Sequence, residues 1–271
     1  MEQKLKALKT YLKELGSVAV AYSSGVDSTF LLKTAHEVLG DKAVAITVQS
    51  SLFPKRELEE AIAFCEEEKI RHIIIELNEL EDMEFTKNPI NRCYLCKKKV
   101  FKMIKEAAIE NGLQYVVEGS NMDDLNDYRP GMKAIVELEI KSPLRVAGLS
   151  KNEIRKLSQA AGLKTYCKPS FACLASRFVY GEAITEEKLL MVDQAEQLLL
   201  DLGFHQFRVR IHGTLARIEV LPEEFDKMMK VETREKIASA FRSYGFSYVT
   251  MDLTGYRMGS MNEVIQSTKE E

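Results

Sequence analysis

The sequence predicts an α/β protein in which helices cover both faces of a parallel sheet, followed by a small α+β domain. The first observation is that short apolar runs alternate with amphipathic helical segments through the first part of the chain, an order typical of a parallel sheet. The second is that this order later changes to helix, strand, strand, helix, helix, strand. We therefore expect one domain over residues 1–182 and another over residues 183–271.

In the first domain, four apolar runs bounded by turns predict the strands. They are residues 17–22, 43–48, 72–77 and 114–120. Helical spacing of apolar residues predicts the helices of this domain, at residues 3–15, 28–40, 54–68 and 95–110. Gly40 ends the second helix, and Pro54 lies near the first turn of the third.

The rest of the chain has less regular patterns. The polar residues 121–131 predict a loop, and Ser150 predicts the N-cap of a helix over about 151–161. Residues 164–184 show little regular pattern and are expected to form a connector beside the site. In the second domain we expect a helix, the two strands of a hairpin, two short helices and a last strand, with the helix at 185–202 and the strands at 207–212, 214–220 and 248–253.

The composition is that of a globular protein without a large nucleic-acid surface. The chain has 271 residues, is 45% hydrophobic and 29% charged, and carries a formal net charge of −3. Nucleic-acid surfaces depend on clustered Lys and Arg, so this balance argues against one. The sequence shows no stretch of membrane-spanning length and no apolar core of a secretory signal. We therefore expect a cytoplasmic protein whose five cysteines are reduced.

A phosphate-binding loop is predicted between the first strand and the following helix, where the sequence reads SSGVDS. Gly25 permits close backbone approach, the serines offer hydroxyl donors, and the helix N-terminus adds N–H groups. Asp27 suits such a site if Mg²⁺ is bound there. The other interpretation is a serine-rich turn that caps a helix. The string matches the S-x-G-x-D-S loop of PP-loop ATP pyrophosphatases, which implies adenine nucleotide α-hydrolase-like chemistry, in which ATP is cleaved between its α- and β-phosphates.

Segments after three of the strands meet at one edge of the predicted sheet, because ligands of such sheets bind beyond the carboxyl ends of the strands. The candidate ATP-binding residues there are Ser23, Ser24, Gly25, Val26, Asp27, Ser28, Ser50 and Gly119. Asp123 and Asp124 follow the fourth strand and are candidate Mg²⁺ ligands. Solvated loop carboxylates are the alternative interpretation of this pair.

Three cysteines form a second candidate constellation. Cys93 and Cys96 make a C-x-x-C pair at a helix start, and Cys173 lies on the connector. A zinc site would need a fourth ligand such as Cys167 or His72, whereas a redox site could use the pair alone. A [4Fe-4S] cluster could take three thiolates and leave one iron open to carry a sulfide, and we favour this assignment. Reduced cysteines without a metal are the remaining alternative.

Basic residues gather on the predicted hairpin. Arg208 and Arg210 face the same side of one strand, as Arg217 and Glu219 do on the other, and Arg177 lies beside Ser176 on the connector. Guanidinium groups suit a phosphate or a carboxylate, which indicates an anion site. A solvent-facing hairpin with cross-strand ion pairs is the alternative, and spacing alone favours it.

Taken together, these residues resemble the LarE family, the pyridinium-3,5-biscarboxylic acid mononucleotide sulfurtransferases. The matching strings are YSSGVDST at 22–29, SLF at 51–53, NDYRPGMKA at 126–134, SRFVYG at 176–181, RVRIH with ARIE within 208–219, and MDLTGYRMGSMN at 251–262. The resemblance implies that ATP adenylates a carboxylate of the pyridinium mononucleotide and that sulfur then displaces AMP, which leaves a thiocarboxylate. This reaction is a step in making the nickel-pincer nucleotide cofactor of lactate racemase.

The resemblance also implies roles for single residues. Cys173 matches the sulfur-bearing cysteine, and Ser176 and Arg177 are expected to be catalytic with it, while Asp27 of the phosphate loop is the remaining candidate catalytic residue. The positions linked to the substrate phosphate or to the site near the cysteine are Ser176, Arg177, Glu196, Arg208, Arg210 and Glu219.

The sequence departs from one kind of LarE member. Members with a single active-site cysteine carry an aromatic and a small residue where this chain has Cys93 and Cys96, and they sacrifice the sulfur of their cysteine. The three-cysteine pattern resembles the other kind, which uses a [4Fe-4S] cluster and is supplied with sulfide or another sulfur donor. The resemblance further implies a homo-oligomer, of which a hexamer is one form.

Three other functions compete with this interpretation. A tRNA thiolase also combines a PP-loop with an iron–sulfur cluster, but it should need a broad basic surface or an RNA-binding module. An ammonia-using ligase would leave the cysteine trio unexplained. A nucleotide-sensing protein without turnover would leave Cys173 and the arginines without a role.

Overall fold

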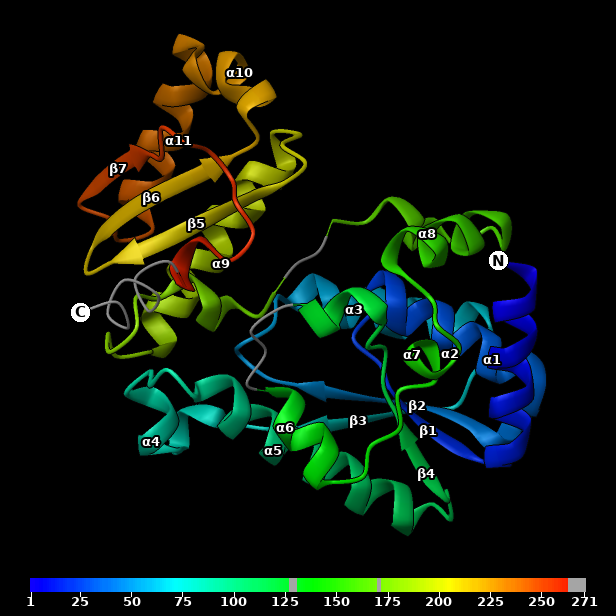
Figure 1. Ribbon diagram of the computed structural model, residues 1–271. Coiled ribbons are helices and arrows are strands. Elements are labelled where there is room, and N and C mark those ends of the chain that lie inside the picture. Colours follow the sequence, from blue (N-terminus) through cyan, green and yellow to red (C-terminus); the bar gives the residue numbers. More distant parts are fainter. Residues whose placement is uncertain (127–130, 170–171, 263–271) are drawn as a thin grey trace. The chain divides into compact units, whose positions relative to one another are not determined.

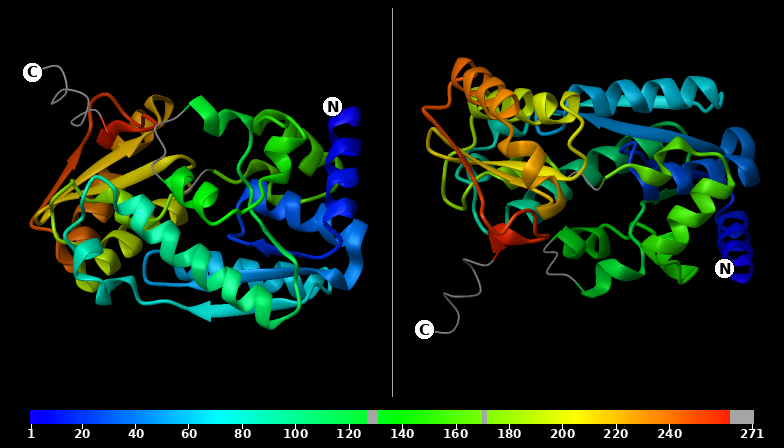
Figure 2. Two further views of the ribbon diagram at one scale, coloured as in Figure 1. Left: turned by 60° about the horizontal axis from the view of Figure 1, so that its bottom comes forward. Right: turned by 90° about the horizontal axis from the view of Figure 1, so that it is seen from above.

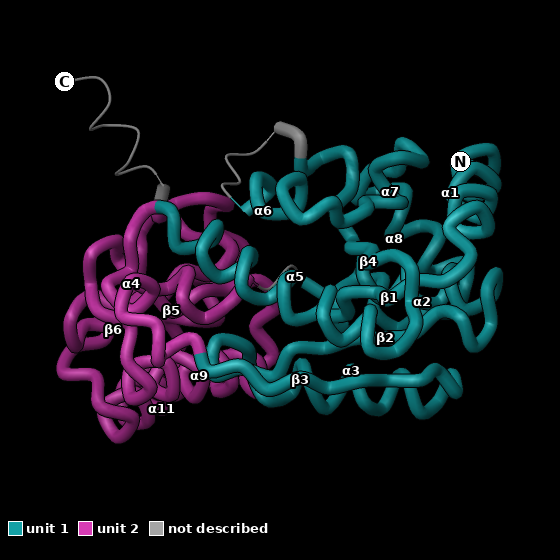
Figure 3. Tube along the Cα trace, turned by 90° about the horizontal axis from the view of Figure 1, so that it is seen from below, with its two compact units in different colours: residues 1–78, 91–171 teal, residues 79–90, 172–271 magenta. Residues whose placement is uncertain are grey.

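The computed structural model describes residues 1–126, 131–169 and 172–262 (Figure 1). It divides into two compact units, which Figure 3 colours separately. Unit 1 comprises Met1–Asn78 with Asn91–Phe171, and unit 2 comprises Glu79–Ile90 with Ala172–Glu271. The domain boundary after residue 182 remains a prediction, because compactness does not show which segment folds independently.

The sheet of unit 1 is parallel and has the strand order β3-β2-β1-β4. The strands are β1 (Val18–Ala21), β2 (Ala43–Gln49), β3 (His72–Glu76) and β4 (Tyr115–Val117). Val18 pairs with Ala43 on one side and with Tyr115 on the other. The predicted fold class is therefore confirmed, and all four apolar runs form strands.

Successive strand residues face opposite sides of this sheet, and each side has its own core. Val18 and Val20 pack into one core and Ala19 into the other. The first core lies under α1 (Glu2–Leu15), α2 (Val26–Leu39), α3 (Lys55–Glu67), α7 (Pro143–Val146) and α8 (Lys151–Ala160), and the second under α5 (Arg92–Glu110) and α6 (Gly131–Glu137). Figures 1 and 2 show these helices on the two faces.

Several element boundaries differ from those expected. Helix α2 begins at Val26, so the second half of SSGVDS belongs to its first turn. Helix α5 begins at Arg92, which places both cysteines of the C-x-x-C pair inside the helix. The expected loop over 121–131 holds a 3-10 turn at Met122–Asn126 and the first residue of α6, while its residues 127–130 lie outside the described part. Further 3-10 turns are Gly40–Lys42 and Lys164–Cys167.

Unit 2 has the predicted order of elements. Strands β5 (Phe207–His212) and β6 (Leu215–Val220) form an antiparallel hairpin, and β7 (Tyr248–Met251) lies parallel to β6. The helices are α9 (Glu186–Asp201), α10 (Phe225–Met229) and α11 (Val231–Ser243). Short 3-10 turns complete the unit, at Glu79–Glu81, Leu174–Arg177, Pro222–Glu224 and Ser260–Asn262.

A distant segment of the chain joins unit 2, which the sequence did not indicate. The segment contains α4 (Met83–Thr86) and is held by hydrogen bonds to the connector. Asn88 Nδ2 donates to Val179 O at 2.6 Å, and the N–H of Gly181 donates to Asn88 O at 2.9 Å. Among the described residues, none of the helices is both long and apolar enough to span a membrane.

Candidate functional site

The serine-rich loop joins β1 to α2 at the carboxyl edge of the unit 1 sheet. Gly25 is the N-cap of α2 and has no side chain, so the first N–H groups of the helix are not covered by a capping side chain. Ser28 Oγ donates to Gly25 O at 3.2 Å and shares a hydrogen bond of 3.1 Å with Ser23 Oγ. These contacts shape the loop around backbone N–H groups, which is the arrangement that binds phosphate.

The two predicted glycines of this site, Gly25 and Gly119, differ in how closely other atoms approach them. At Gly119, just past β4, a Cβ would lie 3.1 Å from Ser28 N and 3.2 Å from Asp27 Cβ. The segment after β4 therefore lies directly against the first turn of α2. At Gly25 a Cβ would meet only Ser23 Oγ at 3.5 Å and Ser28 Oγ at 3.9 Å, which are ordinary contacts. Packing therefore does not require a glycine there, whereas a residue without a side chain suits both the N-cap of α2 and the close approach of a phosphate.

Asp27 is a half-buried carboxylate, and one of its two oxygens has no hydrogen-bond partner among the described residues. Lys151 Nζ donates to Asp27 Oδ2 at 2.5 Å, whereas Asp27 Oδ1 is buried and has no hydrogen-bond partner among the described residues. Burial raises the pKa of Asp27, an effect that Lys151 opposes and the nearby Asp124 reinforces. An unpartnered carboxylate oxygen beside a helix N-terminus fits a Mg²⁺ ligand.

The two candidate aspartates after β4 differ in their surroundings. Asp124 is buried and accepts from the N–H of Asn121 at 2.8 Å, and its charge acts on Asp27. Asp123 is exposed and accepts from the N–H of Lys151 at 2.8 Å, at the start of α8. Across the described ranges, His, Cys, Asp and Glu form no group of three that could hold a metal ion. Magnesium binding by this pair stays a prediction.

Lysines at this edge were missed by the sequence analysis. Besides Lys151, Lys168 donates from Nζ to the carbonyl and hydroxyl oxygens of Ser24, at 3.3 Å each, and to Glu57 Oε2 at 2.7 Å. Lys151 follows the predicted N-cap Ser150, but no sequence motif indicates which acidic residue pairs with Lys151 or with Lys168. Ser50, also predicted for this site, accepts from the N–H of Leu52 at 3.1 Å in the turn after β2.

Unit 2 contains a buried cluster of arginines and glutamates. Arg177 donates to Glu196 through Nε at 2.8 Å and through Nη2 at 2.7 Å, and both side chains are almost fully buried. Burial would raise the pKa of Glu196, but the Arg177 guanidinium holds it below its ordinary value. Arg177 Nη1 also donates to the carbonyl oxygens of Ala172, at 2.7 Å, and Cys173, at 3.1 Å. The connector carrying Cys173 is therefore fixed by the cluster.

The hairpin arginines extend this cluster. Arg210 Nη2 donates to Glu219 Oε2 at 2.8 Å and to Ser260 Oγ at 3.0 Å, while its Nη1 donates to Ser176 O at 3.0 Å. Arg208 lies over the ring of Tyr256, with the guanidinium carbon 5.2 Å from the ring centroid. Burial, together with the neighbouring arginine cations, lowers the pKa of Arg208 to about 10. A cationic, desolvated cluster of this kind favours an anionic ligand.

The expectation of a solvent-facing hairpin is wrong. Arg208 and Arg210 are only 4% and 5% exposed, and their side chains contact the connector at Ser176 and the segment after β7 at Tyr256 and Ser260. The predicted residues that unit 2 brings together are Cys173, Ser176, Arg177, Glu196, Arg208, Arg210 and Glu219. Their roles in substrate binding stay predictions.

The cysteines occupy different environments. Cys93 and Cys96 are half-buried in the first turn of α5, and Cys173 is half-buried in unit 2. Cys65 is buried, which raises its pKa to about 12, and Cys167 is exposed. His72 Nε2 forms a 2.8 Å hydrogen bond with Thr47 Oγ1. Thiolates are the donor set of iron–sulfur sites, so the trio fits that assignment chemically, and cluster binding remains a prediction.

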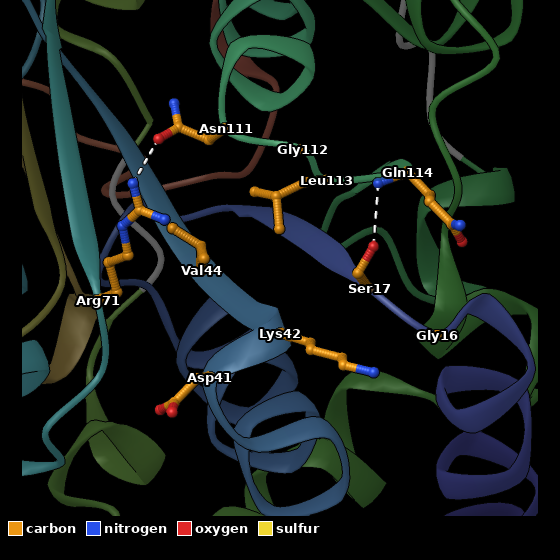
Figure 4. A pocket seen from close by; sticks show the side chains of 10 residues that line it. All are labelled: Gly16, Ser17, Asp41, Lys42, Val44, Arg71, Asn111, Gly112, Leu113 and Gln114. Carbon is orange, nitrogen blue, oxygen red and sulfur yellow. Dashed lines mark hydrogen bonds between the residues drawn. The ribbon is translucent and has the colours of Figure 1, made fainter.

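A pocket of about 370 Å³ lies at the opposite edge of the unit 1 sheet (Figure 4). It is formed where the strands begin, beside the ends of α1 and α5. Its lining residues are Gly16, Ser17, Asp41, Lys42, Val44, Arg71, Asn111, Gly112, Leu113 and Gln114. Ligands of parallel sheets bind beyond the carboxyl ends of the strands, so this pocket is not the candidate site.

Comparisons with known proteins include two relatives that match nearly the whole chain. The family description "Mut7-C RNAse domain" matches residues 1–123. An uncharacterized protein of Synechocystis is 44% identical over 266 residues, which cover 98% of this chain and 99% of that protein. The pyridinium-3,5-bisthiocarboxylic acid mononucleotide synthase of Lactiplantibacillus plantarum is 36% identical over 263 residues, covering 97% and 95%. One subunit of the glutamine-hydrolyzing GMP synthase of Thermoplasma acidophilum is 27% identical over 205 residues, covering 70% and 65%.

Proposed function

The chain belongs to the LarE family of pyridinium-3,5-bisthiocarboxylic acid mononucleotide synthases, and on that premise we propose that it is an ATP-dependent sulfurtransferase. Its substrate is pyridinium-3,5-biscarboxylic acid mononucleotide, one carboxylate of which becomes a thiocarboxylate. The reaction serves the biosynthesis of the nickel-pincer nucleotide cofactor. A small-molecule substrate agrees with the formal net charge of −3, because a protein that binds RNA over a broad surface usually carries an excess of Lys and Arg.

The observation that carries this proposal is the contact of Arg177 with the connector. One guanidinium binds Glu196 on α9 and the backbone carbonyl oxygens of Ala172 and Cys173. The same side chain therefore belongs to the cationic cluster and holds the residue expected to bear sulfur. An anionic nucleotide bound by Arg208 and Arg210 would be held beside that residue, which is the positioning that acyl transfer requires.

The phosphate loop of unit 1 is proposed to carry out the first half-reaction. A substrate carboxylate oxygen attacks the α-phosphorus of ATP, the bond to the β-phosphate oxygen breaks, and pyrophosphate leaves. The N–H groups at the start of α2 and Lys151 would stabilise the phosphate charge. Asp27, with Asp124 nearby, would hold Mg²⁺, which would neutralise charge on the phosphate oxygens.

In the second half-reaction, a sulfur nucleophile attacks the carbonyl carbon of the acyl adenylate. The bond between that carbon and the oxygen linked to AMP breaks, and AMP leaves as the anion. Cys93, Cys96 and Cys173 would hold a [4Fe-4S] cluster, which would supply an open iron to carry a sulfide. Direct attack by Cys173 is the other route: it gives a thioester, and loss of the Cα proton with cleavage of the Cβ–S bond then leaves the thiocarboxylate and dehydroalanine, so the sulfur of that cysteine is consumed.

The test is to incubate the purified protein anaerobically with Mg²⁺, ATP and sulfide, and either the pyridinium mononucleotide or bulk tRNA. We expect AMP and pyrophosphate with the mononucleotide alone, and a product whose mass reflects exchange of one oxygen for sulfur. AMP formation with tRNA alone would overturn the proposal in favour of a tRNA thiolase. Size measurements in the same buffer test the proposed homo-oligomer, of which a hexamer is one form.

A further inference from the structure

Ser24, in the phosphate loop, has an unfavourable backbone conformation. It is buried and has a φ of 50°, in the left-handed region that residues other than glycine rarely occupy. Such a conformation persists only where the surroundings hold it. Here Lys168 Nζ donates to the Ser24 carbonyl oxygen, and the Ser24 hydroxyl donates to Glu57 Oε2 at 2.9 Å.

Lys168 also stands between two carboxylates of α3. Its Nζ pairs with Glu57 Oε2 at 2.7 Å and with Glu60 Oε2. Lys168 and Glu57 are only 13% and 14% exposed, so solvent screens this charge pair weakly. One positive charge thus faces two negative charges directly beside the phosphate loop. Without it, both carboxylates would repel a bound triphosphate.

The backbone around Lys168 is anchored, so its side chain has a defined origin. Arg155 of α8 donates from Nη2 to Lys168 O at 2.8 Å and from Nη1 to Tyr166 O. Fixing a long lysine side chain costs conformational entropy. An anchored backbone limits the positions that the Lys168 side chain can reach, which favours a positioning role over an incidental surface contact.

We propose that Lys168 is a positioning residue of the ATP site, which holds the Ser24 backbone and neutralises Glu57 and Glu60 beside the triphosphate. This inference rests on the proposed use of ATP. It assigns Lys168 no part in bond breaking. Its effect is instead on the affinity for nucleotide, through the geometry of the loop and the local charge.

The experiment measures binding of α,β-methylene-ATP with Mg²⁺ by calorimetry, which needs no sulfur donor and no second substrate. Lys168→Gln should weaken binding roughly tenfold, and Lys168→Arg, which keeps the charge, by less than about threefold. Adding Glu60→Gln to Lys168→Gln should restore part of the affinity, because Glu57 and the Ser24 carbonyl oxygen would still lack the lysine. Glu60→Gln alone, at a residue that is 52% exposed, should tighten binding. High salt should shrink the effect of Glu60→Gln, whose site is half exposed, more than the effect of Lys168→Gln, whose pair with Glu57 is largely buried.

Lys33→Gln is the matched control. It breaks a half-buried ion pair of the same unit, between Lys33 of α2 and Glu68, at 2.5 Å, and should leave nucleotide affinity unchanged. Equal binding by Lys168→Gln and the wild type would overturn the inference while leaving the ATP chemistry intact, as would a loss that Glu60→Gln does not reduce at all. A folded wild type that binds no nucleotide would overturn both.

Discussion

The guanidinium of Arg177 and the carboxylate of Glu196 form a two-bond ion pair, with N–O distances of 2.8 and 2.7 Å, in the interior of unit 2. Glu196 also accepts from the N–H of Val209 at 2.9 Å. The pair therefore ties the connector, α9 and β5 to one another. Burying both charges costs desolvation free energy, and the intact hydrogen bonds of the pair offset that cost.

Removing one partner of this pair should destabilise the protein strongly. We expect Glu196→Gln to lower the free energy of unfolding by about 3–5 kcal/mol, because Arg177 would remain buried without its counter-charge. Urea unfolding measures this loss. Glu106→Gln breaks the exposed Lys102–Glu106 pair, at 3.9 Å, and should change stability by less than about 0.5 kcal/mol. Equal losses in the two variants would contradict the interpretation.

The parallel sheet was predictable from local patterns, whereas its surroundings were not. Each strand of unit 1 is a short apolar run, and in the central strands β1 and β2 burial on both faces produces such runs directly. The fourth strand of unit 1 is shorter than expected: it ends at Val117, and the N–H of Glu118 donates to Lys141 O at 2.9 Å. The segment around Asn88 joins unit 2 through bonds to residues some ninety positions away, which no local pattern encodes.

The candidate site shows the same division. The loop at Ser23–Ser28 was recognisable because its chemistry lies in consecutive residues. The period of two along β5 correctly predicts that Arg208 and Arg210 share a face, but it does not tell which face is covered. Covering depends on Tyr256 and Ser260, which come from a separate segment. Lys168 was missed for this reason too, since its partners lie more than one hundred residues earlier.

Replacing Asp27 should separate activity from stability. Asp27→Asn should lower pyrophosphate release by about a hundredfold or more, because a metal ligand beside the phosphates is lost. Burial raises the pKa of Asp27, so the folded state favours the protonated carboxyl. Its contribution to stability is present below the ordinary pKa of 3.8 and is lost as the pH rises through the raised pKa. Without ligand, the variant should therefore be more stable than the wild type at neutral pH but not in acid.

Glu153 supplies a control of opposite sign for the pH dependence. Its hydrogen bonds to Lys4 and Ser150 lower its pKa from 4.5 to about 2. Glu153→Gln should be less stable than the wild type at neutral pH, and the gap should close as the pH falls from 4.5 toward 2. Urea unfolding across this range checks both signs. Undiminished pyrophosphate release by Asp27→Asn would rule out the proposed adenylation site.

Two alanine substitutions should distinguish packing from ligand access at the phosphate loop. In Gly119→Ala the new Cβ would lie 3.1 Å from Ser28 N, so we expect both lower stability, by about 1–3 kcal/mol, and weaker ATP binding. In Gly25→Ala the Cβ makes ordinary contacts only, so the loss of stability should be limited to that of a poorer N-cap while ATP binding falls. Thermal unfolding and nucleotide titration check the pair. A Gly25→Ala protein that binds ATP normally would show that the ligand does not approach this glycine.

The cysteine trio predicts an iron–sulfur cluster that is lost when a cysteine of the trio is replaced and kept when another cysteine is replaced. Protein purified anaerobically should be brown and contain about four iron and four sulfide ions per chain. Cys93→Ala should lose the colour and both ions, whereas Cys167→Ala, at an exposed position outside the trio, should keep them. Visible absorption with iron and sulfide analysis provides the measurement. If colourless wild-type protein instead loses the mass of one sulfur and two hydrogens at Cys173 after turnover, the cysteine is the sulfur source and the cluster assignment is wrong.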